Sequence, residues 1–174
     1  LLPFLGALAV LLTPSAYRAA WRYIAIAATG ITVLVAVSVF FGFQVGYGGY
    51  QMVANHAWVP AIGLNYHVGV DGISVGLLLV ASLVAFAASW VSEEIRSQEK
   101  LFYALLLVMV AGVFGAFISL DLFFLYFFNE LALVPTFLMI GIWGRGPDKS
   151  AVAFQITLYL SLGALVALVG LVCL

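Results

Sequence analysis

The sequence contains few charged residues. Only 7% of its 174 residues are Asp, Glu, Lys or Arg, whereas soluble globular proteins contain about 25%. Hydrophobic residues make up 66% of the chain, and its mean hydropathy is +1.25. A chain of this composition has too few polar groups to cover a surface that faces water. We therefore expect an integral membrane protein surrounded by lipid.

Other scarcities exclude whole classes of function. Six basic and seven acidic residues give a net charge of −1, without the basic surface that nucleic acids require. The single cysteine, Cys173, excludes an internal disulfide and a cysteine-ligated metal or iron–sulfur site. With only two histidines, His56 and His67, the chain has few residues that could ligate haem iron. The sequence also has no phosphate-binding loop, dinucleotide fingerprint or nucleophile elbow. We expect this chain to bind no cofactor, no metal and no nucleic acid.

Six apolar segments are candidates for transmembrane helices. A helix crosses the ~30 Å hydrocarbon layer with about 20 apolar residues, at ~1.5 Å per residue. The segments are continuous, without the alternation of barrel strands, so they predict an all-α membrane fold. They run over Leu1–Leu12, about Trp21–Phe43, Gly72–Val91, Leu101–Ser119, Leu122–Trp143 and from about Ala151 to the end.

The chain divides into helices 1–2 (residues 1–43), a connecting loop (44–71) and helices 3–6 (72–174). The loop is rich in Gly, Tyr and Asn, and its short extended pieces suggest a β-hairpin. Because the chain starts at Leu1 rather than Met and ends at Leu174 within an apolar run, we interpret it as the N-terminal part of a longer protein.

The basic residues predict an orientation in the membrane. All of them fall in alternate connections: Arg18 and Arg22, Arg96 and Lys100, Arg145 and Lys149. The positive-inside rule makes that side cytoplasmic, so the N-terminus and the 44–71 loop lie on the outer side. A bacterial plasma membrane, or the inner membrane of an organelle, fits this arrangement.

Glu130 is the most informative residue. It lies within the fifth apolar segment, about 13 Å along a helix from Asp121 and therefore close to the middle of the bilayer. An ionised carboxylate costs several kcal/mol there, so such a residue usually faces a polar cavity or a partner and often belongs to a proton pathway. The alternative is a glutamate that only holds helices together by hydrogen bonding.

Three further residues lie in positions that could support this site. Pro135 leaves the carbonyl of Leu131 without its helical donor, and either kinks the helix beside Glu130 or is an inert transmembrane proline. Asp71 and Asp121 open the third and fifth segments, where helix N-caps are expected, although a role in proton access is an alternative.

Two stretches resemble the antiporter-like membrane subunits of respiratory complex I. One is the run from Trp58 to Ser74, with WVP and YHVGVDGIS, and the other is the run from Asp121 to Pro135, DLFFLYFFNELALVP. The resemblance covers about residues 55–170. The closing GIWG at 141–144 is similar to subunit M, the mitochondrial chain 4 type.

The resemblance implies about fourteen helices with two inverted repeats, of which this chain would hold the first six helices. It implies that Glu130 is the family's fifth-helix glutamate, coupled to a lysine further along. It also implies that FMN, iron–sulfur clusters, NADH and quinone are bound by other subunits, and that L- and N-type membrane subunits are neighbours. Gln155, where we would place a family lysine, and Asn129, where an aromatic is common, depart from the pattern.

The sequence thus favours a proton-translocating subunit of an NADH–quinone oxidoreductase. Two alternatives stay open. One is a subunit of an Mrp-type cation/proton antiporter or of a membrane hydrogenase, which share the fold. The other is a structural membrane scaffold.

Overall fold

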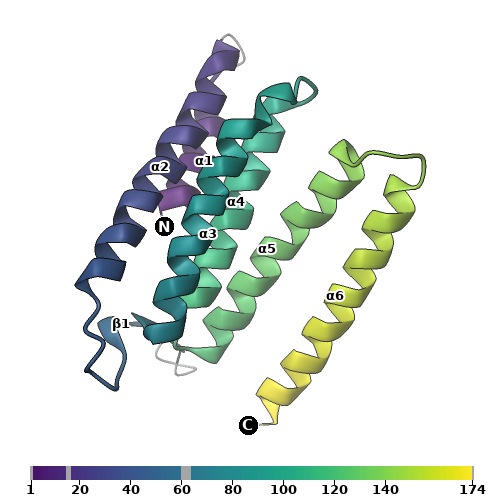
Figure 1. Cartoon of the computed structure of the whole chain (residues 1–174). Helices are drawn as coiled ribbons and strands as arrows, with labels where there is room; N and C mark the ends of the chain where they lie inside the picture. Colours follow the sequence, from purple (N-terminus) through teal and green to yellow (C-terminus); the bar gives the residue numbers. More distant parts are fainter. Residues whose placement is uncertain (1, 15–16, 60–63, 174) are drawn as a thin grey trace.

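The computed structural model describes residues 2–14, 17–59 and 64–173, which form six α-helices and one β-hairpin (Figure 1). The helices are α1 Leu2–Leu12, α2 Arg18–Gly42, α3 Gly72–Val91, α4 Glu99–Ile118, α5 Leu122–Trp143 and α6 Lys149–Val172. A short 3₁₀ turn, η3 Ser92–Glu94, follows α3, and the strands are β1 Gln51–Val59 and β2 Leu64–Val70.

Five of the helices are long and apolar enough to cross a membrane, namely α2 to α6. The exception is α1, which has 11 apolar residues in the described part of the chain and is shorter than a full span. Its last turn is closed by Thr13, whose hydroxyl donates to the Ala9 carbonyl at 2.8 Å. Pro14 follows and has no N–H to continue the helix. The expected all-α membrane fold is confirmed, with five full spans and one short apolar helix.

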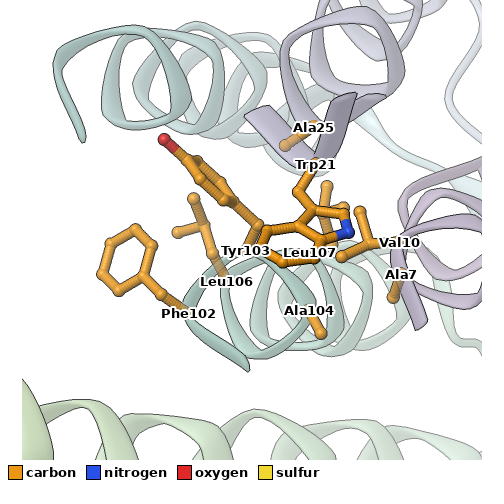
Figure 2. Packing of buried hydrophobic residues seen from close by; sticks show 9 residues of the cluster. All are labelled: Ala7, Val10, Trp21, Ala25, Phe102, Tyr103, Ala104, Leu106 and Leu107. Atoms are coloured by element: carbon orange, nitrogen blue, oxygen red, sulfur yellow. The ribbon is translucent and has the colours of Figure 1, made fainter. Parts of the chain in front are cut away.

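The α4 helix lies at the centre of the molecule and packs against α1, α2, α3 and α5. Its buried residues join those of α1 and α2 in the main hydrophobic cluster, which Figure 2 shows. Trp21 reaches from α2 across α4 toward Val10 of α1, and its indole N–H donates to the Thr13 carbonyl at 3.4 Å. Leu107 of α4 and Val10 are both fully buried. This cluster fixes α1 and α2 against the central helix.

The last two helices, α5 and α6, are covered by fewer neighbouring helices than α4 is. The α5 helix packs against α4 on one side and α6 on the other, and Figure 1 shows α6 at the edge of the molecule, separated from α1–α3 by α5. Large apolar side chains of α6, such as Phe154, Tyr159 and Val166, are exposed. Such a surface is compatible with lipid or with another apolar protein surface.

The hairpin lies in the 44–71 connection, where the sequence suggested one. Its strands are antiparallel, with an irregular register near each end of β1. Met52 has a φ of 52° beside the first irregularity. The hairpin is fastened to the start of α5 because the Leu120 N–H donates to the His67 carbonyl at 2.9 Å. Pro60, which belongs to the WVP motif, lies outside the described residues.

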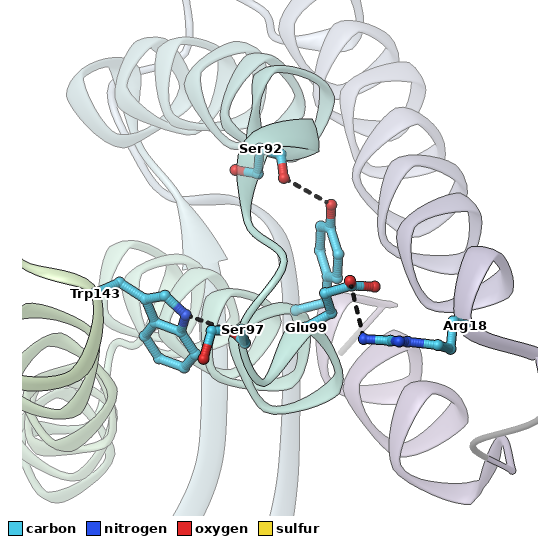
Figure 3. A network of polar contacts seen from close by, with 6 residues as sticks. Arg18, Ser92, Ser97, Glu99 and Trp143 are labelled. Carbon is cyan, nitrogen blue, oxygen red and sulfur yellow. Dashed lines mark hydrogen bonds and ion pairs between the residues drawn. The ribbon is translucent and has the colours of Figure 1, made fainter.

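The opposite end of the bundle carries the basic residues. Arg18 pairs with Glu99 at 3.3 Å, and the Trp143 indole donates to the Ser97 carbonyl at 2.8 Å (Figure 3). Arg22 pairs with Glu93 at 3.0 Å. The charged segment 93–100 is therefore engaged with α2 and α5 as well as with solvent.

Candidate functional site

The helix that carries Glu130 begins at a side-chain cap. The Oδ1 atom of Asp121 accepts the N–H groups of Phe123 at 2.9 Å and Phe124 at 3.2 Å. These are amide groups that have no partner within the helix. From this fixed start the 22-residue α5 runs through the apolar layer and places Glu130 about 13 Å from the cap along the axis.

The Glu130 side chain is half-buried. Its Oε1 atom is shielded from solvent and, among the described residues, no group donates or accepts a hydrogen bond with it. A buried carboxyl oxygen without a partner is costly, because neither water nor protein replaces its hydration. The free energy of the charged form therefore depends on whatever group comes to lie opposite that oxygen.

The neighbouring turn of α5 adds one polar side chain on the same face. Tyr126 precedes Glu130 by one helical turn, is half-buried like it, and its hydroxyl lies within the electrostatic reach of the carboxylate. Asn129, in contrast, is exposed on another face of the helix. Tyr126 and Glu130 thus form a short polar pair in an otherwise apolar stretch.

The α4 helix approaches α5 closely beside Glu130. A Cβ atom at Gly112 would lie 2.8 Å from both the Ala132 nitrogen and the Phe128 oxygen, which are backbone atoms of α5. At Gly115 it would collide with the Phe128 ring. Glycine at these two positions therefore lets the α5 backbone and the Phe128 ring rest directly on α4 close to Glu130.

Pro135 is buried within the turn that follows Glu130. It removes the donor for the Leu131 carbonyl. The adjacent Thr136 hydroxyl donates to the Ala132 carbonyl at 2.8 Å, so that carbonyl has an additional partner. The helix continues to Trp143 despite the missing bond.

Asp71 caps α3 with a reciprocal set of hydrogen bonds. Its Oδ1 atom accepts the N–H of Ser74 at 2.6 Å and that of Ile73 at 3.1 Å, while the Ser74 hydroxyl accepts the Asp71 N–H at 2.8 Å. The hydrogen bond from the Ser74 amide to the carboxylate is the main cause that holds the pKa of Asp71 below its ordinary value of 3.8.

Asp71 and Asp121 lie at the hairpin end of the bundle, and Glu130 lies deeper. The strand β2 leads directly into Asp71, and its Val68 bridges to Ser119 just before α5. The three carboxylates thus occupy two levels along the helix bundle. The structure does not gather them into one cluster.

The two histidines belong to the hairpin. His56 lies opposite Tyr66, and His67 lies opposite Asn55. Within residues 2–14, 17–59 and 64–173, no group of three or more His, Cys, Asp or Glu side chains could hold a metal ion.

Sequence comparisons point to one family. The profile described as "NADH:quinone oxidoreductase/Mrp antiporter, TM" matches residues 119–174, which include Asp121, Glu130 and Pro135. A NAD(P)H-quinone oxidoreductase chain 4 of Nostoc is 34% identical over 172 residues, covering 97% of this chain and 31% of the relative. NADH-quinone oxidoreductase subunit M of Rhodobacter capsulatus is 36% identical over 162 residues, covering 91% of this chain and 30% of the relative.

The chain is similar to the antiporter-like membrane subunits of complex I, of the subunit M type. It spans about a third of the length of these curated relatives. The fold agrees, because a chain in the structure "Respiratory complex I from Thermus thermophilus with bound NADH" superposes with a TM-score of 0.77 at 24% identity. That superposition covers 94% of this chain and 32% of the other.

The two residues that the resemblance suggested as departures from the family pattern are both exposed. Asn129 is exposed on α5 and Gln155 is exposed on α6. Neither side chain has a hydrogen bond to another described residue. Polar amides on a membrane-spanning surface favour contact with another polar surface over contact with lipid.

A set of buried polar residues that sequence reasoning missed lies in α2 and α3. Four hydroxyl side chains are buried there, and each donates to a carbonyl of its own helix: Thr29, Thr32, Ser82 and Ser89. Their hydrogen bonds are satisfied, so they allow close packing without an unpaired polar group. Their recurrence at three and seven residues, which places them on one helical face, is the signal that could have identified them.

Proposed function

We propose that this chain is part of a proton-translocating membrane subunit of an NADH–quinone oxidoreductase and that Glu130 exchanges protons during turnover. The supporting observation is the Glu130 carboxyl group itself. It lies near the middle of α5, inside the segment that the family profile matches, and its Oε1 atom is buried without a partner.

A carboxyl group in this environment responds strongly to a nearby charge. In the apolar interior, a cation that approaches the free oxygen stabilises the carboxylate, and its withdrawal favours the protonated form. The basic residues of the described helices lie near the starts of α2, α4 and α6, at the basic end of the bundle, and α5 itself contains no Lys or Arg. We propose that the cation comes from a lysine outside this chain segment or from another subunit.

The chain would take part without binding a redox group. FMN, iron–sulfur clusters, NADH and quinone would be bound by other subunits, and their electron transfer would drive the change in charge beside Glu130. We propose neighbouring membrane subunits of the L and N types as protein partners, and lipid around the remaining surface.

The test is a pair of substitutions at Glu130 in the assembled membrane complex. Glu130→Gln keeps the size and hydrogen-bonding capacity of the side chain but cannot ionise, whereas Glu130→Asp keeps the ionisable group. We expect Glu130→Gln to reduce NADH-driven proton uptake into inverted vesicles by about tenfold or more, equivalent to ~1.4 kcal/mol. Glu130→Asp should retain part of the activity.

The matched control is Glu94→Gln, which removes an exposed carboxylate at the basic end of the bundle. Assembly is checked by recovery of the complex and its NADH oxidation by a quinone analogue. Full proton uptake with Glu130→Gln, in a complex that assembles normally, would refute the proposed role.

A second candidate is an Mrp-type antiporter subunit, because the profile that matches residues 119–174 is named for NADH:quinone oxidoreductase and for the Mrp antiporter alike. A related membrane-hydrogenase subunit is a variant of this candidate. Affinity purification of the membrane assembly by a tag on this chain distinguishes complex I from the antiporter. Co-purified flavin, iron–sulfur signals and inhibitor-sensitive NADH oxidation support the complex I assignment. Sodium-dependent proton exchange in vesicles, without NADH activity, identifies the antiporter.

A structural scaffold is the remaining alternative. In that case Glu130 only contributes packing and a hydrogen bond, so Glu130→Gln keeps function while Glu130→Leu prevents assembly. The same set of vesicle measurements therefore separates all three alternatives.

A further inference from the structure

A charged cavity lies at the basic end of the bundle, between the start of α2, the segment after α3 and the start of α4. Its volume is about 390 Å³. Among the side chains that line it are Arg18, Arg22, Arg96, Glu93, Glu99 and Tyr103. It is distinct from the Glu130 site, which lies within α5.

The charges of the cavity are not balanced. Its lining includes three guanidinium groups and two carboxylates, which leaves one positive charge. Arg18 is paired with Glu99 and Arg22 with Glu93. Among the described residues no carboxylate lies within 4.0 Å of the Arg96 guanidinium. One anionic charge is therefore missing from the cavity.

Arg22 has unused hydrogen-bonding capacity. One of its terminal nitrogens donates to the Trp90 carbonyl at 3.1 Å and approaches Glu93 at 3.0 Å. Its Nε–H is shielded from solvent and has no acceptor among the described residues. Guanidinium N–H groups bind phosphate oxygens through charge-assisted hydrogen bonds, and the Nε–H of Arg22 has no competing acceptor among the described residues.

The surroundings of the cavity indicate a lipid rather than a free ion. Tyr23 lines the cavity and is 67% exposed, and Trp90 and Val91, at the end of α3, are 55% and 74% exposed. These apolar side chains lie at the end of two membrane-spanning helices, at the level where headgroups meet acyl chains. An ion bound in the cavity would therefore have an apolar surface beside it that suits a hydrocarbon tail.

We propose that this cavity binds the phosphodiester of an anionic phospholipid. A phosphodiester carries one negative charge at neutral pH, which matches the excess of one positive charge. A lipid with no further charge on its headgroup, such as phosphatidylglycerol, fits better than a zwitterionic lipid, whose headgroup cation would face the arginines. The lipid would join α2, the segment after α3, and α4 at the membrane surface.

The test measures lipid binding to the membrane assembly that contains the full chain. The assembly is purified, stripped of lipid, titrated with phosphatidylglycerol or phosphatidylcholine, and analysed by native mass spectrometry. We expect Arg96→Gln to weaken the binding of one phosphatidylglycerol by about fivefold, the factor for loss of one cationic contact near an anionic headgroup. Arg22→Gln should weaken it further.

Controls separate the cavity from general charge effects. Arg145→Gln removes a charge at the same end of the bundle, from an almost fully exposed side chain outside the cavity, and should bind as the original protein does. Because Arg22 also holds the Trp90 carbonyl, its variant could unfold locally, whereas the exposed Arg96 can be replaced without that risk.

The proposal fails if phosphatidylcholine binds as tightly as phosphatidylglycerol, or if Arg96→Gln and Arg145→Gln have equal effects. A further measurement adds millimolar inorganic phosphate as a competitor of the bound lipid. If it displaces the lipid, the cavity is a site for free phosphate and the lipid assignment is overturned.

Discussion

At the scale of single residues, the acidic side chains differ chiefly in where they lie. Six of the seven are in the segments at helix ends or in connections, where water or backbone N–H groups solvate them. Glu130 is the one acidic residue that lies near the middle of a described helix long enough to span the membrane. The same carboxyl chemistry therefore serves as a cap at Asp71 and as a candidate proton carrier at Glu130, because their surroundings differ.

The Asp71 cap predicts a pH-dependent contribution to stability. Because hydrogen bonds lower its pKa in the folded protein below 3.8, the cap stabilises the fold at neutral pH. That contribution is lost as the pH falls through the folded-state pKa. We expect Asp71→Ala to lower the free energy of unfolding by ~1 kcal/mol at pH 7. The difference should shrink below about pH 4, as measured by thermal unfolding in detergent.

Asp148 provides the matched control. It precedes α6 as Asp71 precedes α3, but its side chain makes no capping hydrogen bond. Asp148→Ala should therefore lower the free energy of unfolding by less than Asp71→Ala does. That smaller loss should not shrink as the pH falls below about 4. Equal losses in the two variants would mean that the hydrogen bonds of Asp71 are not what stabilises α3.

At the scale of elements, the contact between α4 and α5 determines where Glu130 lies. Backbone atoms of α5 occupy the space that a side chain at Gly112 would need. Backbone cannot move aside as a flexible side chain can, so any larger residue must push the two helices apart. The position of the glutamate thus depends on a residue that carries no functional group.

Gly112→Ala tests this dependence. Overpacking costs typically ~1–3 kcal/mol, against which alanine gains ~1 kcal/mol of helix propensity. We expect a net loss of thermal stability in detergent and a weaker proton uptake, because α5 is displaced. The control is Gly76→Ala in α3, where no atom lies within 4 Å of the added Cβ, so only the gain in propensity should appear. A stabilised Gly112→Ala variant would show that the helices separate at no cost.

At the scale of the whole molecule, the charges divide the protein into two ends. The connections that carry Arg and Lys lie at one end, where ion pairs join them to Glu93, Glu94 and Glu99. The hairpin and the two aspartate caps lie at the other. Isolated exposed pairs of this kind contribute ~0–1 kcal/mol each, so the charge asymmetry adds little stability, and the positive-inside rule assigns it to orientation in the membrane.

The orientation is testable with introduced cysteines in a Cys173→Ser background. Gly48→Cys lies in the exposed segment before the hairpin and Ser97→Cys in the exposed connection before α4. In intact cells a membrane-impermeant thiol reagent should label the first at once. The second should react only after the membrane is opened. The reverse pattern would place the basic end outside and contradict the positive-inside assignment.

The sequence by itself determined the kind of protein and the positions of most helices. Continuous apolar runs bounded by Asp71 and Asp121 predicted α3 and α5 with the bounds observed, since a membrane span is set by its length and its flanking polar groups. Glu130 could be singled out because a carboxyl group within such a run conflicts with its apolar surroundings. The same reasoning took the first apolar run as a span, whereas the helix described there has 11 residues.

Only the tertiary structure decided which faces meet. The apolar side chains surround these helices on all sides, so their sequence pattern does not distinguish a face toward lipid from a face toward protein. Packing placed Gly112 against α5, buried hydroxyl side chains of α2 and α3, and left the Oε1 atom of Glu130 without a partner among the described residues. It also brought Arg22 and Arg96, which are distant in the sequence, to one cavity. Hydropathy along one chain determines depth in the membrane, whereas contacts between helices depend on shape and short-range packing, which the chain acquires only when it folds.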